Sequence, residues 1–195
     1  MQNSETMQFQ ALTVERWRDL QNLFGREGAH DGCWCMFWRL ERPEFTRQRG
    51  SENNHALKTI VNSGKPAGIL AYLDGQPIAW CSVAPRETFL APEMKKILNV
   101  LKGPREHNVW SIVCFFVAKP YRNKGVMIPM LNAVTDYAKR NGAEIVEGYP
   151  IEPRGTLRPP AGCTGVASAF RKAGFVKIGE RTERKPIMRR IINRR

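Results

Sequence analysis

The stretch that decides the fold spans residues 109–130 and reads VWSIVCFFVAKPYRNKGVMIPM. Its first part, Val109–Val117, is the most apolar run in the chain, which predicts a central strand buried on both faces. A short basic loop follows at 119–125, and apolar residues then recur at helical spacing over 126–140, which predicts an amphipathic helix. A further strand-like run at 143–149 completes a β-α-β unit.

The elements on either side of this unit indicate a mixed α/β chain. Asp74-Gly75 separates two strand-like runs and is a strong hairpin signal. The charged segment 41–52 reads as an exposed connection. The order of elements indicates an α/β chain of the α+β type with an antiparallel first half. The other expected elements are strands at 7–12, 67–73, 77–83, 175–179 and 187–192, helices at 14–24, 53–62, 92–101 and 166–173, and a long loop at 150–165.

The composition is that of an ordinary folded domain. The 195 residues suffice for one domain with its own core, and 42% hydrophobic with 25% charged residues excludes disorder as the main state. Five cysteines are too few, and odd in number, for a disulfide scaffold, so we expect a reduced, cytoplasmic protein. No run reaches the roughly 18 apolar residues of a membrane span, and the polar segment 1–10 has no signal-peptide pattern. We therefore expect neither secretion nor membrane insertion.

The charge balance is strongly basic. Lys and Arg number 31 against 18 Asp and Glu, for a net charge of +13. Such an excess favours polyanionic partners: nucleic acid, an anionic membrane surface or a phosphate-rich small molecule. The alternative is a solvated surface that keeps the protein soluble. No helix-turn-helix pair, zinc finger or RNP-like motif accompanies the charge, so nucleic acid is not the favoured partner.

The loop at 119–125 has the ingredients of an anion site. The first N–H groups of a helix lack internal partners and lie at its positive end, and a glycine lets the backbone approach a ligand closely. Gly125 stands at that point with Arg122 and Lys124 beside it, and Pro129 fits the first helical turns. The alternative is a plain connection with solvated basic side chains. The chain contains neither a Walker-type P-loop nor a G-x-G-x-x-G fingerprint.

Two segments resemble the GNAT superfamily of N-acetyltransferases. Residues 122–127, RNKGVM, resemble the motif [Q/R]-x-x-G-x-[G/A], whose backbone amides bind the pyrophosphate of acetyl-CoA in that family, although Met127 replaces the last small residue. Residues 167–175, ASAFRKAGF, resemble the family's closing segment, and the expected element order is similar over nearly the whole chain. The resemblance implies a single domain over 1–195. Its sheet would be mixed and mostly antiparallel, flanked by helices, with the β-α-β unit holding the cofactor.

The resemblance also implies which residues bind acetyl-CoA. In the family, the strand before the loop separates from its neighbour and pairs with the pantetheine arm. No metal is implied. The residues assigned to the cofactor in this way are Phe115, Phe116 and Val117 on the strand and Arg122, Asn123, Lys124, Gly125, Val126 and Met127 in the loop and helix start.

The usual catalytic residues of the family do not carry over. A Tyr commonly acts as the acid in the closing helix, where this chain has Phe170. A base carboxylate often lies early on the central strand, where this chain has Trp110 and Ser111. Glu147, on the following strand, is the best remaining candidate for the base, and Tyr149 is the candidate acid. The alternative is that Glu147 is a surface residue of its strand.

The segment Cys33-Trp34-Cys35 invites a metal or redox interpretation. No second pair at zinc-like spacing follows it, so we expect no metal. Trp34, Phe37 and Trp38 are too aromatic for a plain exposed loop. They are either core residues or the lining of the acceptor pocket, because family members place acceptor contacts between their first two helices.

The sequence therefore predicts an N-acetyltransferase that moves the acetyl group of acetyl-CoA to a primary amine. The acceptor would be a small molecule, a peptide N-terminus or a lysine. The alternative is a non-catalytic module of the same fold that binds CoA or nucleic acid, which the missing Tyr and base carboxylate favour. Positioning alone can accelerate acyl transfer substantially, so neither absence excludes an enzyme. The sequence leaves a homodimer open.

Overall fold

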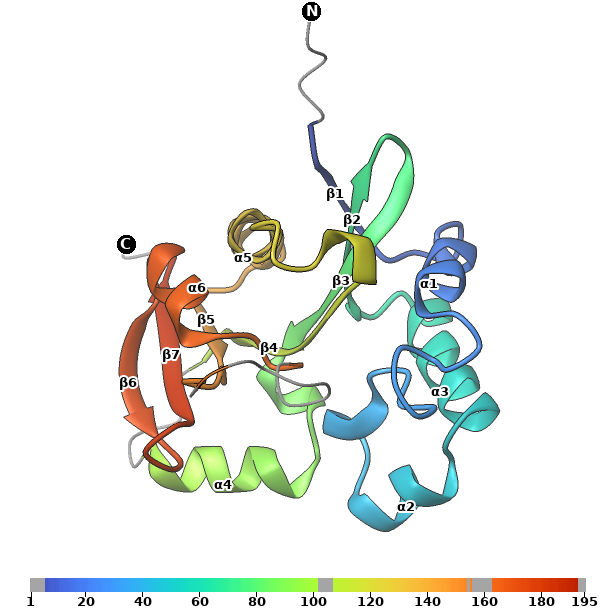
Figure 1. Cartoon of the computed structure of the whole chain (residues 1–195). Coiled ribbons are helices and arrows are strands. Elements are labelled where there is room, and N and C mark those ends of the chain that lie inside the picture. Colours follow the sequence, from blue (N-terminus) through green and yellow to red (C-terminus); the bar gives the residue numbers. More distant parts are fainter. Residues whose placement is uncertain (1–5, 102–106, 154, 156–162, 193–195) are drawn as a thin grey trace, which may run out of the picture.

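The computed structural model of the chain describes residues 6–101, 107–153, 155 and 163–192, and its strands form one twisted sheet (Figure 1). The strand order within these residues is β1-β2-β3-β4-β5-β7-β6. Each neighbouring pair is antiparallel except β4 and β5, which are parallel. The expected mostly antiparallel sheet and its β-α-β unit are confirmed. The strands are β1 (Gln8–Ala11), β2 (Gly68–Leu73), β3 (Gln76–Pro85), β4 (Val109–Val117), β5 (Ile145–Gly148), β6 (Val176–Glu180) and β7 (Pro186–Ile191).

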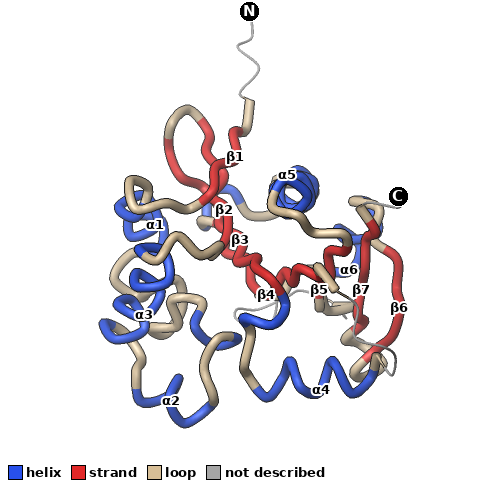
Figure 2. Tube along the Cα trace, turned by 180° about the vertical axis from the view of Figure 1, so that it is seen from behind, coloured by secondary structure: helices blue, strands red, loops and turns tan. Residues whose placement is uncertain are grey.

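Helices cover both faces of the sheet (Figures 1 and 2). One face, to which Cys81 of β3 points, packs against α5 and α6; the other, to which Trp80 points, packs against α1, α2 and α3. The neighbouring helix α4 packs beside Val113 of β4. No helix in the described ranges is long and apolar enough to cross a membrane. The helices are α1 (Trp17–Phe24), α2 (Arg42–Arg47), α3 (Ser51–Asn62), α4 (Pro92–Val100), α5 (Met127–Arg140) and α6 (Ala167–Lys172).

The hairpin predicted at Asp74-Gly75 is confirmed. β2 and β3 pair antiparallel around it, and the two turn residues have φ values of 50° and 77°, as a two-residue hairpin turn requires. Residues 41–52 are mostly exposed or half-buried, but they are not the plain connection that we expected, because α2 and the start of α3 lie there. Phe45 of α2 is buried edge-on against Phe37, with 5.5 Å between ring centroids. A short helix held by one apolar side chain has no periodicity that a sequence reading could detect.

β4 and β5 pair only along the first part of β4. The parallel pairing ends at Ile112, opposite the last residue of β5. Val113 then forms a bulge against β3, a feature that bends a strand and is frequent beside active sites. Beyond the bulge, the edge of β4 that β5 leaves open contacts the segment before α6, where the Phe115 N–H donates to the Cys163 carbonyl. Most of the loop predicted at 150–165 lies outside the described residues.

Candidate active site

The loop between β4 and α5 presents backbone N–H groups to open space. Arg122 braces the loop, since its guanidinium Nε donates to the Val117 carbonyl at 2.9 Å. Asn123 and Gly125 have φ values of 60° and 76°, and α5 then begins at Met127 without a side-chain cap. A Cβ atom at Gly125 would meet nothing within 4 Å. No side chain caps the first N–H groups of α5, as an anion site would require, and the binding of an anion at this loop stays a prediction.

The β4 residues assigned to the cofactor point to both faces of the sheet. Phe115 packs edge-on against Phe170 of α6, with 6.1 Å between ring centroids. Phe116 packs edge-on against Phe24 of α1 on the other face, at 5.4 Å, and Val117 lies on the Phe115 face. These side chains build the two cores. What β4 would offer to an extended ligand is therefore the backbone along the edge that β5 does not pair with, where the Phe115 N–H now donates to the Cys163 carbonyl.

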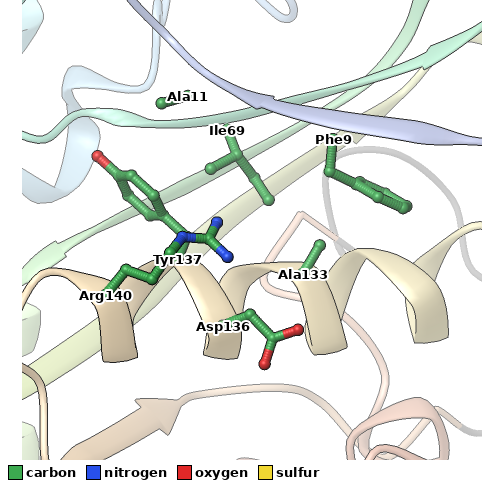
Figure 3. A pocket seen from close by; sticks show the side chains of 7 residues that line it. All are labelled: Phe9, Ala11, Ile69, Ala133, Asp136, Tyr137 and Arg140. Atoms are coloured by element: carbon green, nitrogen blue, oxygen red, sulfur yellow. The ribbon is translucent and has the colours of Figure 1, made fainter.

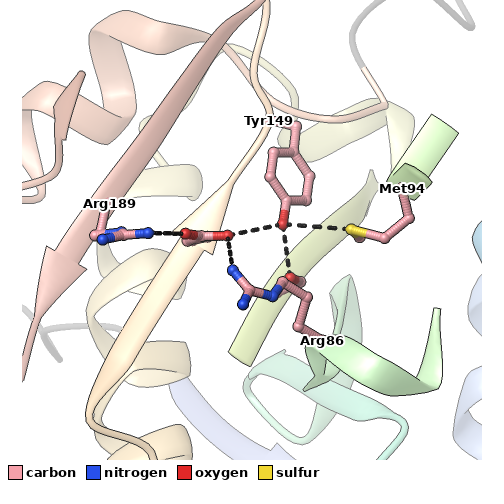
Figure 4. Close-up of polar contacts among 6 residues, drawn as sticks. Arg86, Met94, Tyr149 and Arg189 are labelled. Atoms are coloured by element: carbon pink, nitrogen blue, oxygen red, sulfur yellow. Dashed lines mark hydrogen bonds and ion pairs between the residues drawn. The ribbon is translucent and has the colours of Figure 1, made fainter. Parts of the chain in front are cut away.

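Glu147 is buried between Arg86 and Arg189, the two arginines labelled in Figure 4. Its side chain has no exposed surface, so the alternative of a surface strand residue is wrong. Arg189 of β7 donates to Oε1 from Nη2 at 2.6 Å and from Nε at 3.1 Å, and Arg86 donates to Oε2 from Nη1 at 3.2 Å. The paired guanidinium groups compensate the buried charge, which would otherwise be costly. The burial of Glu147 is thus complete.

Tyr149 lies just beyond β5 and shares this network. Its hydroxyl donates to Glu147 Oε2 at 3.1 Å, and it also lies 2.7 Å from Ser111 Oγ and 3.8 Å from the Met94 sulfur. Burial, and next the charge of Glu147, raise the pKa of Tyr149 well above its ordinary value. The phenol therefore stays protonated. The structure brings the two predicted catalytic residues into direct contact at the point where β4 and β5 separate.

The aromatic loop after α1 divides between this network and the core. The Trp38 ring stacks on the Tyr149 ring at 5.9 Å and 27°, and Phe37 lies edge-on to Trp38 at 5.8 Å. Trp34 instead stacks on Trp17 at 6.1 Å and is buried in the core under α1. Trp38 and Phe37 are thus the members of the predicted acceptor set that lie near Tyr149.

Sequence reasoning missed Arg86 and Arg189. Each is far from Glu147 along the chain, by 61 and 42 residues. Arg189 is the direct partner of Glu147 in the β5–β7 pairing, so only the strand register places them together. The one available signal was the pair of opposite charges, Glu147 and Arg189, on two late strands. That signal could be interpreted only with the knowledge that β5 and β7 are neighbours.

A hollow of about 190 Å³ lies elsewhere, between α5 and the edge of the sheet at β1 and β2 (Figure 3). None of the residues predicted for the site lines it, so we do not assign the reaction to it. Its lining residues are Phe9, Ala11, Ile69, Ala133, Asp136, Tyr137 and Arg140.

The thiols of the Cys33-Trp34-Cys35 segment give no metal site. In the ranges that the structure describes, no three or more His, Cys, Asp or Glu side chains are placed to hold a metal ion. Burial, and next the neighbouring Cys35, raise the pKa of Cys33 to about 12, so it is a thiol in the metal-free protein. We expect elemental analysis of the purified protein to find no stoichiometric zinc. One tightly held zinc per chain would contradict this.

Comparisons with known proteins agree with this geometry. The model of the acetyltransferase (GNAT) family matches residues 34–149, which include β4, the basic loop, Glu147 and Tyr149. No curated protein matches the sequence.

Solved structures of several acetyltransferases share the fold. The PaiA N-acetyltransferase from Thermoplasma acidophilum, in complex with coenzyme A, is 12% identical with a TM-score of 0.55, and the match covers 96% of this chain and 99% of that one. YncA, a putative acetyltransferase from Salmonella typhimurium with acetyl-CoA, is 11% identical with a TM-score of 0.55, covering 97% and 95%. An uncharacterized protein from Bacillus halodurans, bh2621, is 14% identical with a TM-score of 0.59, covering 96% and 84%.

Proposed function

The chain belongs to the GNAT acetyltransferase family, and from this premise we propose that it transfers the acetyl group of acetyl-CoA to a primary amine. The observation that carries the proposal is the uncapped start of α5 behind Gly125, which follows the part of β4 that β5 no longer pairs with. A phosphate group and an extended arm need these two features side by side. PaiA and YncA, which share the fold, hold coenzyme A and acetyl-CoA.

The residues assigned to the cofactor would contribute backbone hydrogen bonds and positive charge. The N–H groups of Gly125, Val126 and Met127 would receive the pyrophosphate, with Arg122 and Lys124 supplying positive charge nearby. Asn123 shapes the loop through its positive φ. The backbone of residues 115–117 would pair with the pantetheine arm. Bound there, acetyl-CoA supplies a reactive thioester next to Tyr149, which lies where β4 and β5 part.

Tyr149 and Glu147 would move the proton that the reaction displaces. Both Glu147 oxygens are occupied by arginines, so an amine reaches the carboxylate only by way of the Tyr149 hydroxyl. The hydroxyl takes the proton of the attacking nitrogen while its own proton passes to Glu147. The proton then returns along the same path to the departing sulfur. One proton moves from nitrogen to sulfur, and Glu147 ends the cycle as a carboxylate.

The acceptor would lie beside the aromatic loop. Trp38 stacks on Tyr149, and Phe37 lies edge-on to Trp38, so the aromatic loop borders the Tyr149 side chain. Aromatic faces attract ammonium groups, which suits a small-molecule or peptide amine. Trp34 supports the loop from the core. A single protomer carries all of these groups, so the proposal does not depend on a homodimer.

Acetyl-CoA should raise the melting temperature of the purified protein. A ligand at about 100 times its Kd adds about 2.7 kcal/mol to the free energy of unfolding, and each kcal/mol is worth about 2–4 °C in a chain of this size. The test is a thermal-shift titration with acetyl-CoA, followed by an assay for released thiol with a panel of primary amines. No shift would contradict the proposed cofactor site.

The same experiment separates the enzyme from its alternative. A shift without thiol release for any amine would favour a non-catalytic module that binds CoA. Binding to random DNA that weakens steeply with salt would favour the nucleic-acid module, because such binding releases counterions.

A further inference from the structure

Four cysteines from three distant segments lie near one another beside the part of β4 that β5 does not pair with. Cys33 and Cys35 come from the aromatic loop, Cys114 from β4, and Cys163 from the segment before α6. The Cys114 thiol lies within hydrogen-bonding reach of Cys163 and of Cys35, and Cys33 lies near Cys35 and Cys163. All four are free thiols. The proposed acetyl transfer uses none of them, so this cluster needs a separate explanation.

We propose that Cys114 and Cys163 form a reversible disulfide that closes β4 to the pantetheine arm. The proposal rests on the proposed function, because it assumes that acetyl-CoA uses the backbone at 115–117. It makes the pair an oxidative modification site, with a peroxide as the oxidant.

The backbone already holds these two residues together. The Phe115 N–H donates to the Cys163 carbonyl. The Cys114 α-carbon is two covalent bonds from the donor nitrogen, and the Cys163 α-carbon is two covalent bonds from the acceptor oxygen. Disulfides need α-carbons within about 7 Å, and this hydrogen bond brings the two cysteines close to that range. The disulfide would therefore form with little backbone movement.

The segment that carries Cys163 fills the gap between β4 and the chain beyond β5. The Ile151 N–H donates to the Gly165 carbonyl, and Ile151 forms a parallel bridge with Val166. Gly165 packs so tightly that a Cβ atom there would lie 2.9 Å from Phe170 and 3.1 Å from Phe115. The segment thus takes the Phe115 N–H and the space beside it, both of which the pantetheine arm would need. Acetyl-CoA can enter only when this segment moves away.

Cys163 is the thiol that would react first. It is exposed, and the hydrogen bond from Cys114 lowers its pKa. The same hydrogen bond, with burial, raises the pKa of Cys114 well above its ordinary value, and burial does the same for Cys81. Only a thiolate attacks a peroxide readily, so oxidation should begin at Cys163.

The chemistry balances with one peroxide molecule. The Cys163 thiolate attacks hydrogen peroxide, the O–O bond breaks, and hydroxide leaves with a proton as water, which oxidises the sulfur to a sulfenic acid by two electrons. The Cys114 sulfur then attacks the Cys163 sulfur and the S–O bond breaks. The departing hydroxide takes the Cys114 proton and leaves as a second water. Two thiols and one peroxide yield one disulfide and two waters, and an added dithiol reverses the step.

The test combines a peptide map with the thermal-shift assay, before and after peroxide treatment of the full chain. We expect a Cys114–Cys163 linked peptide after oxidation, loss of the acetyl-CoA shift, and recovery of the shift when dithiothreitol is added. Cys163→Ser should keep the full shift after peroxide. Cys33→Ser is the matched control, because it removes a neighbouring thiol and should still form the disulfide.

Three results would overturn the proposal. They are the absence of a disulfide after oxidation, a disulfide that joins other cysteines, and an undiminished acetyl-CoA shift in protein whose Cys114–Cys163 link has been mapped. Failure of the proposed function is distinguishable from these. It would appear as no acetyl-CoA shift in the reduced protein, whereas the peptide map tests the disulfide without any cofactor.

Discussion

Glu147→Gln should lower turnover by about 100-fold or more, the usual scale for loss of a general base, while the affinity for acetyl-CoA stays nearly unchanged. The loss corresponds to about 2.7 kcal/mol of transition-state stabilisation. Gln keeps the shape of the side chain but cannot accept the proton that Tyr149 delivers. The measurement is kcat and KM for both substrates with any amine that the wild-type protein accepts.

A second variant separates catalysis from stability. Glu147→Gln leaves Arg86 and Arg189 without a buried counter-charge, and breaking such a pair typically costs about 3–5 kcal/mol of stability. Tyr149→Phe keeps both ion pairs and removes only the hydroxyl, so it should lower kcat on a similar scale in a folded protein. Thermal melts of both variants show which losses come from unfolding.

Two matched controls lie close by in the structure. Glu144→Gln removes an exposed carboxylate near β5 that accepts a hydrogen bond from the Asn108 side chain, and Tyr137→Phe removes the hydroxyl of a half-buried Tyr that packs on Trp110. Both should turn over like the wild-type protein. Wild-type turnover in Glu147→Gln would exclude this carboxylate from the proton path.

The fold could be predicted well wherever one local pattern decided the structure. The long apolar run of β4, the Asp74-Gly75 turn and the amphipathic α5 each depend on residues adjacent in the chain, and all three are confirmed. Helix α2 was not predicted, because Phe45 is its one buried side chain and gives no periodic apolar pattern. Its contact with Phe37 is a tertiary interaction, and tertiary interactions stabilise most short helices.

The candidate site shows the same difference between features that depend on adjacent residues and features that depend on the tertiary fold. The loop that ends at Gly125 is contiguous, so its glycine and basic residues could be interpreted from the sequence alone. The surroundings of Glu147 could not, because Arg86, just after β3, and Arg189 of β7 reach it through the order and register of the sheet. The meeting of Cys114 with Cys163 has the same origin, since it depends on the point where β5 leaves β4.

Gly125→Val should abolish the thermal shift caused by acetyl-CoA. Gly125 has a φ of 76°, and a Cβ atom there would enter open space in front of the first N–H groups of α5. A branched side chain would occupy the volume that the pyrophosphate needs. The measurement is the thermal-shift titration, in which the wild-type response should be absent from the variant at every acetyl-CoA concentration.

The substitution also strains the backbone, which the control must reproduce. A β-branched residue in this region of φ costs about 1–3 kcal/mol, so Gly125→Val should melt below the wild-type protein even without ligand. Gly142, just after the other end of α5, has a φ of 85° and equally open space around its Cβ position. Gly142→Val should therefore lose similar stability but keep the full acetyl-CoA shift. If both variants keep the shift, the loop before α5 is a plain connection, and the cofactor must bind elsewhere.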